Sequence, residues 1–375
     1  MRVVYLVSTL RRAGPTSQLL NIVRHLDSRQ FEPTIVTLSP EPADSMRDAF
    51  DAAGVPVRTL ALSRLAGAIH RGWRRDIGRL LGAALDNRMV VHSQGIRGDV
   101  IASRRLAGLP RVATARNYPG DEYPMKFGPL AGRWMARTHF RAFRAHPCVV
   151  ACSSTLSEQL RQHGIAAAVI RNGVDTSVFR PALAPERARL RELLAIPPAA
   201  RVGVSIGALS TRKDPVVIVR AMKSIEDPDL VLVFVGAGQL EAECRREAGG
   251  DPRIRFVGQV TDVASYMRAA SFLVSASRSE GLPNSVLEGL ACGLGVVLTD
   301  IGPHRELLRL TSDRGVAFPV GDDRALAQAL RNEPSRDASN TPGSSAALAK
   351  RLGADRMSQQ YQELYLRLAA QAARP

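Results

Sequence analysis

The feature of this sequence that most constrains its fold is a regular alternation of short, β-branched apolar runs with longer amphipathic segments. The apolar runs are almost uniformly hydrophobic, which is typical of parallel strands covered by helices on both faces. Strands that alternate with helices predict βαβ units and therefore an α/β fold. The predicted strands are 2–7, 34–38, 57–60, 89–92, 112–114 and 149–152, followed by 202–207, 230–235, 254–257, 272–274, 296–299 and 316–318.

The pattern runs once to about residue 170 and then starts again, which predicts two domains. The segment 170–181 and the prolines that follow it mark an interdomain connection, and 375 residues suffice for two domains. Two doubly wound sheets that face each other leave a cleft at the carboxyl ends of their strands, where ligands bind. We therefore expect an N-terminal domain over 1–172, a second domain over 173–345, and a final helix within 346–375 that packs back on the first domain.

The net charge of +16 is distributed unevenly along the chain. Residues 1–172 hold 25 Lys and Arg against 12 Asp and Glu, whereas the remainder holds 26 against 23. Such an excess indicates a polyanionic partner, either nucleic acid, an anionic membrane or a phosphate-bearing substrate. Only four of the 51 basic residues are lysine, so a compositional bias toward arginine is an alternative explanation. No nucleic-acid reading motif is recognised, and we expect no nucleic-acid partner.

Composition and cysteine usage narrow the class of protein further. The chain is 45% hydrophobic and 23% charged, as ordinary globular proteins are, which excludes a disordered or collagen-like chain. Its four cysteines are too few for a disulfide framework and lack zinc spacing, which favours a reducing compartment. The first residues lack the features of a signal peptide, and no run approaches the 18 apolar residues of a membrane span. These observations predict a cytoplasmic protein.

The most informative stretch lies in the second half, where a predicted strand ends near Ser275. A polar loop leads to a helix that begins around 284–285, and the free N–H groups of a helix start bind anions. Gly281 lets a ligand approach the backbone closely. Glu280 on the loop and Glu288 on the helix are offset along one ligand, and carboxylates readily accept hydrogen bonds from sugar hydroxyls. Two alternatives stay open: Glu288 closes a capping box with Ser285, or Glu280 is a solvated surface charge.

A second loop, 207–215, follows another predicted buried strand. It holds Arg212 and Lys213 before a helix that Asp214 caps and Pro215 begins. Cations at the carboxyl end of a strand suit a diphosphate, although basic residues before a helix are often solvent-facing as well. The chain has no GxGxxG fingerprint, Walker A loop or nucleophile elbow.

These segments resemble the retaining glycosyltransferases of family 4, also called glycosyl transferases group 1. The resemblance implies a GT-B fold of two Rossmann-like domains and transfer of a sugar from a nucleotide diphosphate sugar to a hydroxyl with retained configuration. It also implies that no metal or other cofactor is needed, because cations and helix N-termini stabilise the leaving diphosphate. The matching segments are 172–181, 207–213, 280–288, 291–297, 299–302 and 315–322, which cover most of residues 170–325.

The resemblance also assigns roles to individual residues. Lys213 and Arg212 would neutralise the diphosphate and Glu280 would contact the transferred sugar, which makes these three the catalytic candidates. Glu288 would contact the ribose. In the turn 8–18 the family has phosphate-facing amides, and Pro15 removes one of them. The other donor-binding candidates are Gly14, Gly207, Gly258, Gln259, Gly281, Leu282, Pro283, Asn284 and Ser285.

Two positions depart from the family pattern. Ala208 stands where the family often has an arginine, which removes one phosphate cation. Arg116 stands where the family frequently has a histidine, which indicates an anionic acceptor group. Asn117 and His92, both in the half that binds the acceptor in this family, complete the acceptor candidates, although a histidine at a strand end is often structural.

Basic residues gather in two segments of the first half. Basic amphipathic helices bind anionic membrane surfaces, and a solvated helix face is the alternative. One segment holds Arg71, Trp73, Arg74, Arg75 and Arg79; the other holds Arg133, Arg137, Arg141 and Arg144 on one helix face, interleaved with Trp134, Phe140 and Phe143.

Together these observations predict a cytoplasmic enzyme, a glycosyltransferase of the hexosyltransferase class, peripheral at the inner face of the cell membrane. Its partners would be a nucleotide sugar and a cell-envelope glycan of O-antigen, capsule or exopolysaccharide type, with a lipid-linked glycan as one candidate. The alternatives are a nucleotide-sugar epimerase of the same fold, a non-catalytic basic binding protein for nucleic acid, and a degenerate subunit without activity.

Overall fold

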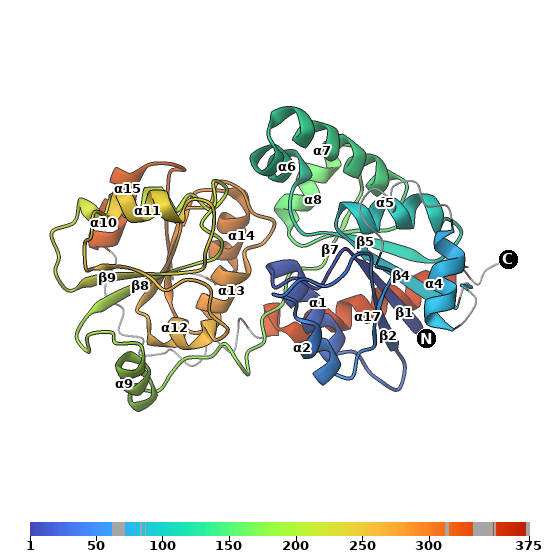
Figure 1. Ribbon diagram of the computed structural model, residues 1–375, viewed down its shortest axis with the longest axis horizontal. Coiled ribbons are helices and arrows are strands. Elements are labelled where there is room, and N and C mark those ends of the chain that lie inside the picture. Colours follow the sequence, from blue (N-terminus) through green and yellow to red (C-terminus); the bar gives the residue numbers. More distant parts are fainter. Residues whose placement is uncertain are drawn as a thin grey trace. The chain divides into compact units, whose positions relative to one another are not determined.

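The computed structural model describes residues 1–61, 72–82, 85–86, 88–311, 315–332, 348 and 350–372. The chain divides into two compact units (Figure 1). Unit 1 comprises Met1–Gly173 and Ala354–Pro375, and unit 2 comprises Val174–Gly353. Each unit is a parallel sheet with helices on it, which confirms the predicted α/β class with two Rossmann-like sheets.

Within its described residues, unit 1 has a seven-stranded sheet in the order β3-β2-β1-β4-β5-β6-β7. All its pairings are parallel, and the register sets Val4 opposite Thr34 on one side and Val91 on the other. The sequence did not predict β7, because two residues leave no recognisable apolar run. The strands are β1 (Arg2–Val7), β2 (Glu32–Thr37), β3 (Val57–Thr59), β4 (Met89–Gln94), β5 (Arg111–Ala115), β6 (Val149–Ala151) and β7 (Ala168–Val169).

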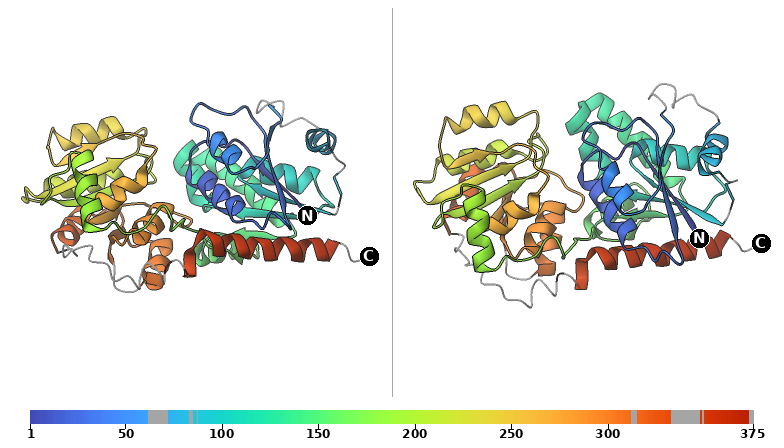
Figure 2. Two further views of the ribbon diagram at one scale, coloured as in Figure 1. Left: turned by 90° about the horizontal axis from the view of Figure 1, so that it is seen from below. Right: turned by 60° about the horizontal axis from the view of Figure 1, so that its bottom comes forward.

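Helices cover the sheet of unit 1, and the last helix of the chain, α17 (Ala354–Ala372), lies along it (Figure 2). Tyr361 and Tyr365 of α17 are buried in one core with Tyr5 of β1. The start that the sequence predicts for this helix, residue 346, lies outside the described residues. The other helices are α1 (Gly14–Arg24), α2 (Arg47–Ala52), α4 (Trp73–Leu81), α5 (Ile96–Arg105), α6 (Pro119–Phe127), α7 (Pro129–Arg144) and α8 (Ser154–Arg161).

Unit 2 has, within its described residues, a six-stranded parallel sheet in the order β10-β9-β8-β11-β12-β13. Its strands are β8 (Arg201–Ile206), β9 (Leu230–Val235), β10 (Ile254–Phe256), β11 (Phe272–Ser275), β12 (Gly295–Thr299) and β13 (Gly315–Phe318). Its helices are α9 (Ala184–Leu193), α10 (Pro215–Lys223), α11 (Glu241–Ala248), α12 (Val263–Ala269), α13 (Asn284–Ala291), α14 (Gly302–Thr311) and α15 (Asp323–Asn332). In unit 1 the strand order reverses at β1, which lies between β2 and β4. In unit 2 it reverses at β8, which lies between β9 and β11.

A buried polar network ties helices α5, α6 and α7 of unit 1 together. The Asp99 carboxylate on α5 accepts a hydrogen bond from Ser93 at 2.6 Å and lies 2.7 Å from His139 Nε2 on α7. His139 Nδ1 lies 2.8 Å from the hydroxyl of Tyr123 on α6. Burial raises the pKa of Tyr123, so the phenol stays protonated. Gly132 of α7 packs directly on the backbone of α6.

Replacement of Gly132 by alanine tests this close helix packing. A Cβ atom at residue 132 would overlap the backbone of Tyr123 and Pro124, so Gly132→Ala should lower the free energy of unfolding by about 1–3 kcal/mol, although alanine is the better helix former. Urea denaturation measures the change. The neighbouring exposed Ala131→Ser serves as the control and should stay within about 0.5 kcal/mol of the parent. A Gly132→Ala protein as stable as the parent would contradict the packing.

Candidate functional site

The candidate site of unit 2 lies at the carboxyl ends of two neighbouring strands, β8 and β11. These strands pair in parallel, with Gly203 opposite Phe272 and Val204 opposite Leu273. The loop 207–214 follows β8 and leads into α10, and the loop 276–283 follows β11 and leads into α13. Because parallel strands end at the same edge of a sheet, their loops meet there.

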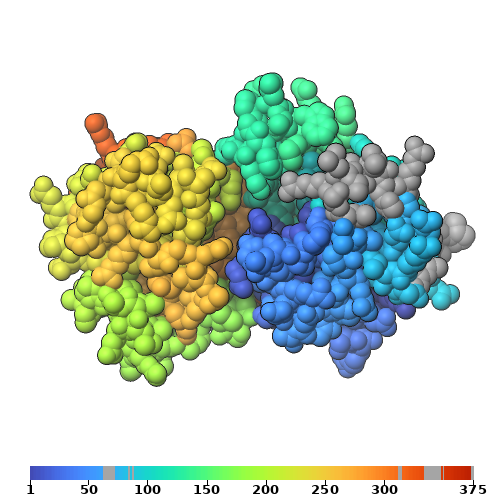
Figure 3. Space-filling model, in the orientation of Figure 1, coloured from blue at the N-terminus to red at the C-terminus, as the bar shows by residue number. Residues whose placement is uncertain are grey.

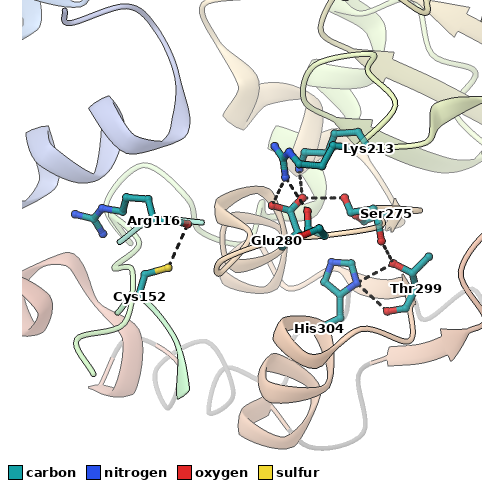
Figure 4. Close-up of polar contacts among 10 residues, drawn as sticks. Arg116, Cys152, Lys213, Ser275, Glu280, Thr299 and His304 are labelled. Atoms are coloured by element: carbon teal, nitrogen blue, oxygen red, sulfur yellow. Dashed lines mark hydrogen bonds and ion pairs between the residues drawn. The ribbon is translucent and has the colours of Figure 1, made fainter. Parts of the chain in front are cut away.

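The two loops meet through a buried carboxylate, that of Glu280, which is 7% exposed (Figure 4). Its Oε1 lies 2.6 Å from Lys213 Nζ, and its Oε2 lies 2.8 Å from Arg212 Nη1. The Ser277 hydroxyl donates to Oε1 at 2.8 Å. The structure therefore brings the three catalytic candidates into direct contact, and the alternative of a solvated Glu280 is wrong.

The electrostatics of Glu280 follow from this geometry. Burial by itself raises the pKa of Glu280, but the charges of Lys213 and Arg212 outweigh burial and hold that pKa well below its usual range. Glu280 is thus an ionised carboxylate at neutral pH. It serves as a hydrogen-bond acceptor and a fixed negative charge, and it cannot act as a general acid.

Asp214 and Arg278 form a second link between the loops. The Arg278 N–H donates to the carbonyl of Arg212 at 2.8 Å, and the Arg278 guanidinium lies 2.7 Å from the Asp214 carboxylate. Asp214 occupies the N-cap position of α10 as predicted, but its side chain does not cap the helix and its φ is +48°. The predicted capping bond is therefore wrong, because the carboxylate pairs with Arg278 instead.

Gly207 shapes the floor of a pocket beside Lys213. Its φ of +136° favours glycine, and a Cβ there would lie 3.3 Å from Lys213 Cε. The pocket lies at the ends of β8 and β11. Its lining includes Ser205, Gly207, Ala208, Lys213, Ser275 and Ala276, so the short side chain of Ala208 faces the space where the family often has an arginine.

Helix α13 begins at Asn284, as predicted, but its start differs from a capping box. Pro283 is the N-cap residue and no side chain caps the helix. The alternative in which Glu288 closes a capping box is therefore wrong. Burial raises the pKa of Glu288 to about 7, and the charge of Lys213 opposes this increase. Glu288 thus titrates near neutral pH, close to the same lysine.

Three residues of the site, Ser277, Thr299 and His304, escaped the sequence analysis, and Figure 4 labels the last two. Thr299 donates to the Ser277 carbonyl at 2.6 Å, and fully buried His304 donates from Nδ1 to the Thr299 carbonyl at 2.8 Å. Burial lowers the pKa of His304 to about 4, so its ring is neutral. These residues support the loop that carries Glu280. The matched segment 299–302 was the only signal for Thr299, and neither Ser277 nor His304 lies in a matched segment.

The other donor-binding candidates divide between the two units. Gly281, Leu282 and Pro283 are buried beside Glu280, and Asn284 and Ser285 form the first turn of α13. Gly258 follows β10 with a φ of +72° and accepts a hydrogen bond from the Gly236 amide at 2.8 Å, whereas Gln259 is exposed. Gly14 begins α1 in unit 1. The structure thus gathers the 281–285 group around Glu280, and the roles of Gly258, Gln259 and Gly14 stay predictions.

The acceptor candidates belong to unit 1, where His92 proves to be a core residue. It is fully buried, and its ring nitrogens lie 2.7 Å from the hydroxyls of Tyr365 and Thr114. With no surface and both nitrogens in use, the prediction that His92 binds the acceptor is wrong. The histidine instead joins β4 to α17 and β5.

Arg116 follows β5, and its Nη1 donates to Asn172 Oδ1 at 2.6 Å. Its Nη2 is buried without a hydrogen-bond partner among the described residues. The Nε2 of neighbouring Gln94 is also buried and unpartnered within the described part of the chain. Two N–H donors at the carboxyl edge of the sheet suit an anionic or carbonyl oxygen. Asn117, the next residue, is partly buried.

The two basic segments differ in their surroundings. On α7 all four arginines are exposed, whereas Phe140 and Phe143 are buried on the opposite face, so the predicted interleaving is wrong for these two. In the other segment Trp73 is a core residue, and Arg71 lies outside the described residues. Arg74, Arg75 and Arg79 are exposed. Among the described helices none is long and apolar enough to span a bilayer, and no described group of three His, Cys, Asp or Glu is placed to hold a metal ion.

Two family profiles match the chain. The one described as Glycosyltransferase Family 4 covers residues 13–178, and the one described as Glycosyl transferases group 1 covers residues 200–332. A solved structure of HepE from Anabaena, in complex with UDP and glucose, superposes with a TM-score of 0.79 over 97% of this chain and 99% of that one, at 18% identity. The similarity in structure identifies the fold as GT-B.

Two curated relatives align over part of their lengths. The UDP-Gal:α-D-GlcNAc-diphosphoundecaprenol α-1,3-galactosyltransferase of Escherichia coli is 26% identical over 64% of this chain and 65% of its own length. The lipopolysaccharide core biosynthesis mannosyltransferase LpsB of Rhizobium meliloti is 28% identical over 43% of this chain and 48% of its own length. The chain thus spans about half to two thirds of these relatives.

The raised pKa of Glu288 predicts a pH-dependent stability. Between about pH 4.5 and pH 7 the folded chain binds this proton more tightly than the unfolded chain, so the contribution of Glu288 to stability falls as the pH rises. Glu288→Gln should remove this fall. Its free energy of unfolding should exceed that of the parent by about 1–3 kcal/mol at pH 8 and should be nearly equal to it near pH 4.5. Urea denaturation at both pH values measures this. An equal difference at both values would contradict the raised pKa.

Proposed function

Because this chain belongs to family 4 of the retaining glycosyltransferases, we propose that it transfers a sugar from a nucleotide diphosphate sugar to a hydroxyl of a cell-envelope glycan. The observation that carries the proposal is the buried Glu280 carboxylate, paired with Lys213 and Arg212 at a parallel strand end. The names of the relatives, a lipid-diphosphate galactosyltransferase and a lipopolysaccharide core mannosyltransferase, support an envelope glycan as the acceptor.

The charges of the site suit a diphosphate donor. Two cations face one carboxylate, which leaves a net positive charge beside the first turns of α10 and α13. In the proposed complex Lys213 and Arg212 neutralise the diphosphate, and the amides of 281–285 bind the phosphate or sugar. Glu280 accepts hydrogen bonds from sugar hydroxyls and Glu288 from the ribose. UDP is the first nucleotide to test, since HepE binds it.

The proposed reaction needs no general base from the protein. The acceptor oxygen forms a bond to the anomeric carbon on the face from which the diphosphate departs, and the anomeric carbon–phosphate oxygen bond breaks. The acceptor proton passes to the departing phosphate oxygen. Lys213 and Arg212 stabilise the charge that develops on this oxygen, which is why the site can work with an ionised Glu280 that holds no proton.

The acceptor is proposed to bind unit 1. The unpartnered Nη2 of Arg116 and Nε2 of Gln94 would receive an anionic or carbonyl oxygen of the acceptor, with Asn117 beside them. A phosphate of a lipid-linked glycan supplies such an oxygen. The four exposed arginines of α7 lie on the same unit. We propose that they contact an anionic membrane surface at the inner face of the cell membrane.

The catalytic assignment predicts a loss of transfer in two variants. Glu280→Gln and Lys213→Ala should each lower the rate of sugar transfer about 10²–10³-fold, because each removes a group that acts on the donor. The assay supplies a panel of UDP- and GDP-sugars with a membrane extract as the acceptor, and mass spectrometry detects the products. Circular dichroism verifies that the variants are folded.

The matched control is Glu186→Gln. This carboxylate also pairs with two arginines, Arg180 and Arg268, but it lies on α9, and its loss should leave transfer unchanged. Full transfer by both site variants would reject the assignment. Conversion of a nucleotide sugar to its epimer without acceptor would show that the protein is an epimerase and would reject the proposed transfer.

The proposed membrane contact predicts salt-sensitive binding to vesicles that contain phosphatidylglycerol. At about 1 kcal/mol per arginine, replacement of Arg133, Arg137, Arg141 and Arg144 by glutamine should weaken partitioning more than tenfold. Co-sedimentation measures it. The control replaces the exposed Arg104, Arg105, Arg246 and Arg324, which removes the same charge elsewhere. Equal weakening by both variants would show that net charge, and not α7, is responsible.

A further inference from the structure

The junction of α6 and α7 carries an exposed apolar cluster that the proposed chemistry does not use. Phe127, the last residue of α6, is 45% exposed, and Leu130 and Trp134 in the first turns of α7 are 83% and 68% exposed. Leu130 and Trp134 are four residues apart and thus neighbours on one helix face. We call these three residues the apolar tip. Helices α6 and α7 lie at the top of unit 1 in Figure 1, and their teal-green atoms are exposed there in Figure 3.

Basic residues lie next to the apolar tip on both helices. Lys126 Nζ lies 5.4 Å from the centre of the Phe127 ring, and Arg133 stands between Leu130 and Trp134 in the sequence. Arg137 and Arg141 continue the stripe of Leu130 and Trp134 along α7, which contains no acidic residue. The acidic residues of α6, Asp121 and Glu122, lie in its first turn, away from the junction. We call Lys126, Arg133, Arg137 and Arg141 the basic collar.

The orientation of the tip is fixed from inside unit 1. Gly132 packs on the backbone of α6, and the buried Asp99–His139–Tyr123 network joins α5, α7 and α6. The helix thus cannot turn its exposed face inward without breaking buried hydrogen bonds. Large apolar side chains that a rigid scaffold holds in water favour a surface on which they can be buried.

We propose that the apolar tip inserts into the interfacial region of an anionic lipid bilayer while the basic collar contacts the lipid headgroups. Aromatic and aliphatic side chains on one helix face with arginines beside them have the composition of membrane-surface helices. A second copy of the chain is a poorer occupant, because two basic collars would face each other. The proposal deepens the membrane contact proposed above, but it does not depend on the transfer chemistry.

The chain carries its own reporter for this insertion. It has two tryptophans, of which Trp73 is 1% exposed in the core and Trp134 is 68% exposed in the tip. On addition of phosphatidylglycerol vesicles, tryptophan emission should shift to shorter wavelength, and lipids brominated on the acyl chains should quench it. Trp134→Phe should abolish both responses, since Trp73 remains buried. Raised salt before vesicle addition should reduce the fraction bound without changing the emission of the bound form.

A paired substitution separates insertion from surface attraction. Phe127→Ser with Leu130→Ser should weaken vesicle binding at least tenfold and reduce quenching of Trp134, although the basic collar is intact. The matched control is Leu183→Ser with Leu193→Ser in unit 2, where both leucines are 70% exposed, and it should leave binding unchanged. Circular dichroism of each variant verifies the fold.

Three results would overturn the proposal. One is vesicle binding without a Trp134 emission shift or quenching by brominated lipids. Another is equal weakening by the tip and control variants. The third is a Trp134 shift that appears without lipid as protein concentration rises, with dimers in sedimentation, which would assign the tip to a second copy. Quenching together with no sugar transfer by the parent would retain the insertion and reject the proposed function, so the two failures are distinguishable.

Discussion

The buried ionised carboxylate of Glu280 is the interaction on which the loop arrangement of unit 2 depends. A carboxylate that is 7% exposed is stable only where cations and donors replace the lost water, and Lys213, Arg212 and Ser277 do so. Because Lys213 and Arg212 come from one strand end and Glu280 from the next, this requirement draws the two loops together. Thr299 and His304 then support the loop from β12 and α14.

The same constraint explains why the small residues of the site are where they are. Gly207 has a positive φ, which favours glycine, where the chain passes beside the Lys213 side chain. The hydroxyl oxygens of Ser275 and Ser277 lie 3.1 Å apart, and that of Ser277 donates to Glu280. The site is thus a polar cluster built on the ends of an apolar sheet, in which the buried charge of Glu280 has two partners of opposite charge.

Unit 1 uses buried polarity differently. Between the sheet and α17, hydrogen bonds link His92 and Thr114 to the tyrosines of α17. A second pair, Asp99 and His139, holds α7 in place. The four arginines of α7 lie at the surface of this unit, on a helix without acidic residues. In unit 2 many arginines are paired with carboxylates, as for Arg180, Arg201, Arg253 and Arg268. Such pairs also occur in unit 1, as for Arg2, Arg11 and Arg161, so the uneven net charge follows from the numbers of basic and acidic residues in the two halves.

The sequence by itself determined the two parallel sheets, because fully apolar runs are required of strands buried on both faces and can be recognised locally. It also singled out Glu280, Lys213 and Arg212, because they lie in loops after predicted strands and in segments that resemble the family. Only the tertiary structure decided that Glu288 is no cap, that His92 is a core residue, that Phe140 and Phe143 turn inward while Trp134 turns outward, and that His304 supports the site. Each of these depends on which distant groups surround a side chain. The local pattern of residues does not determine those neighbours. A histidine or a tryptophan fits the same helix or strand whether its side chain faces water, lipid or a tyrosine hydroxyl from the other end of the chain.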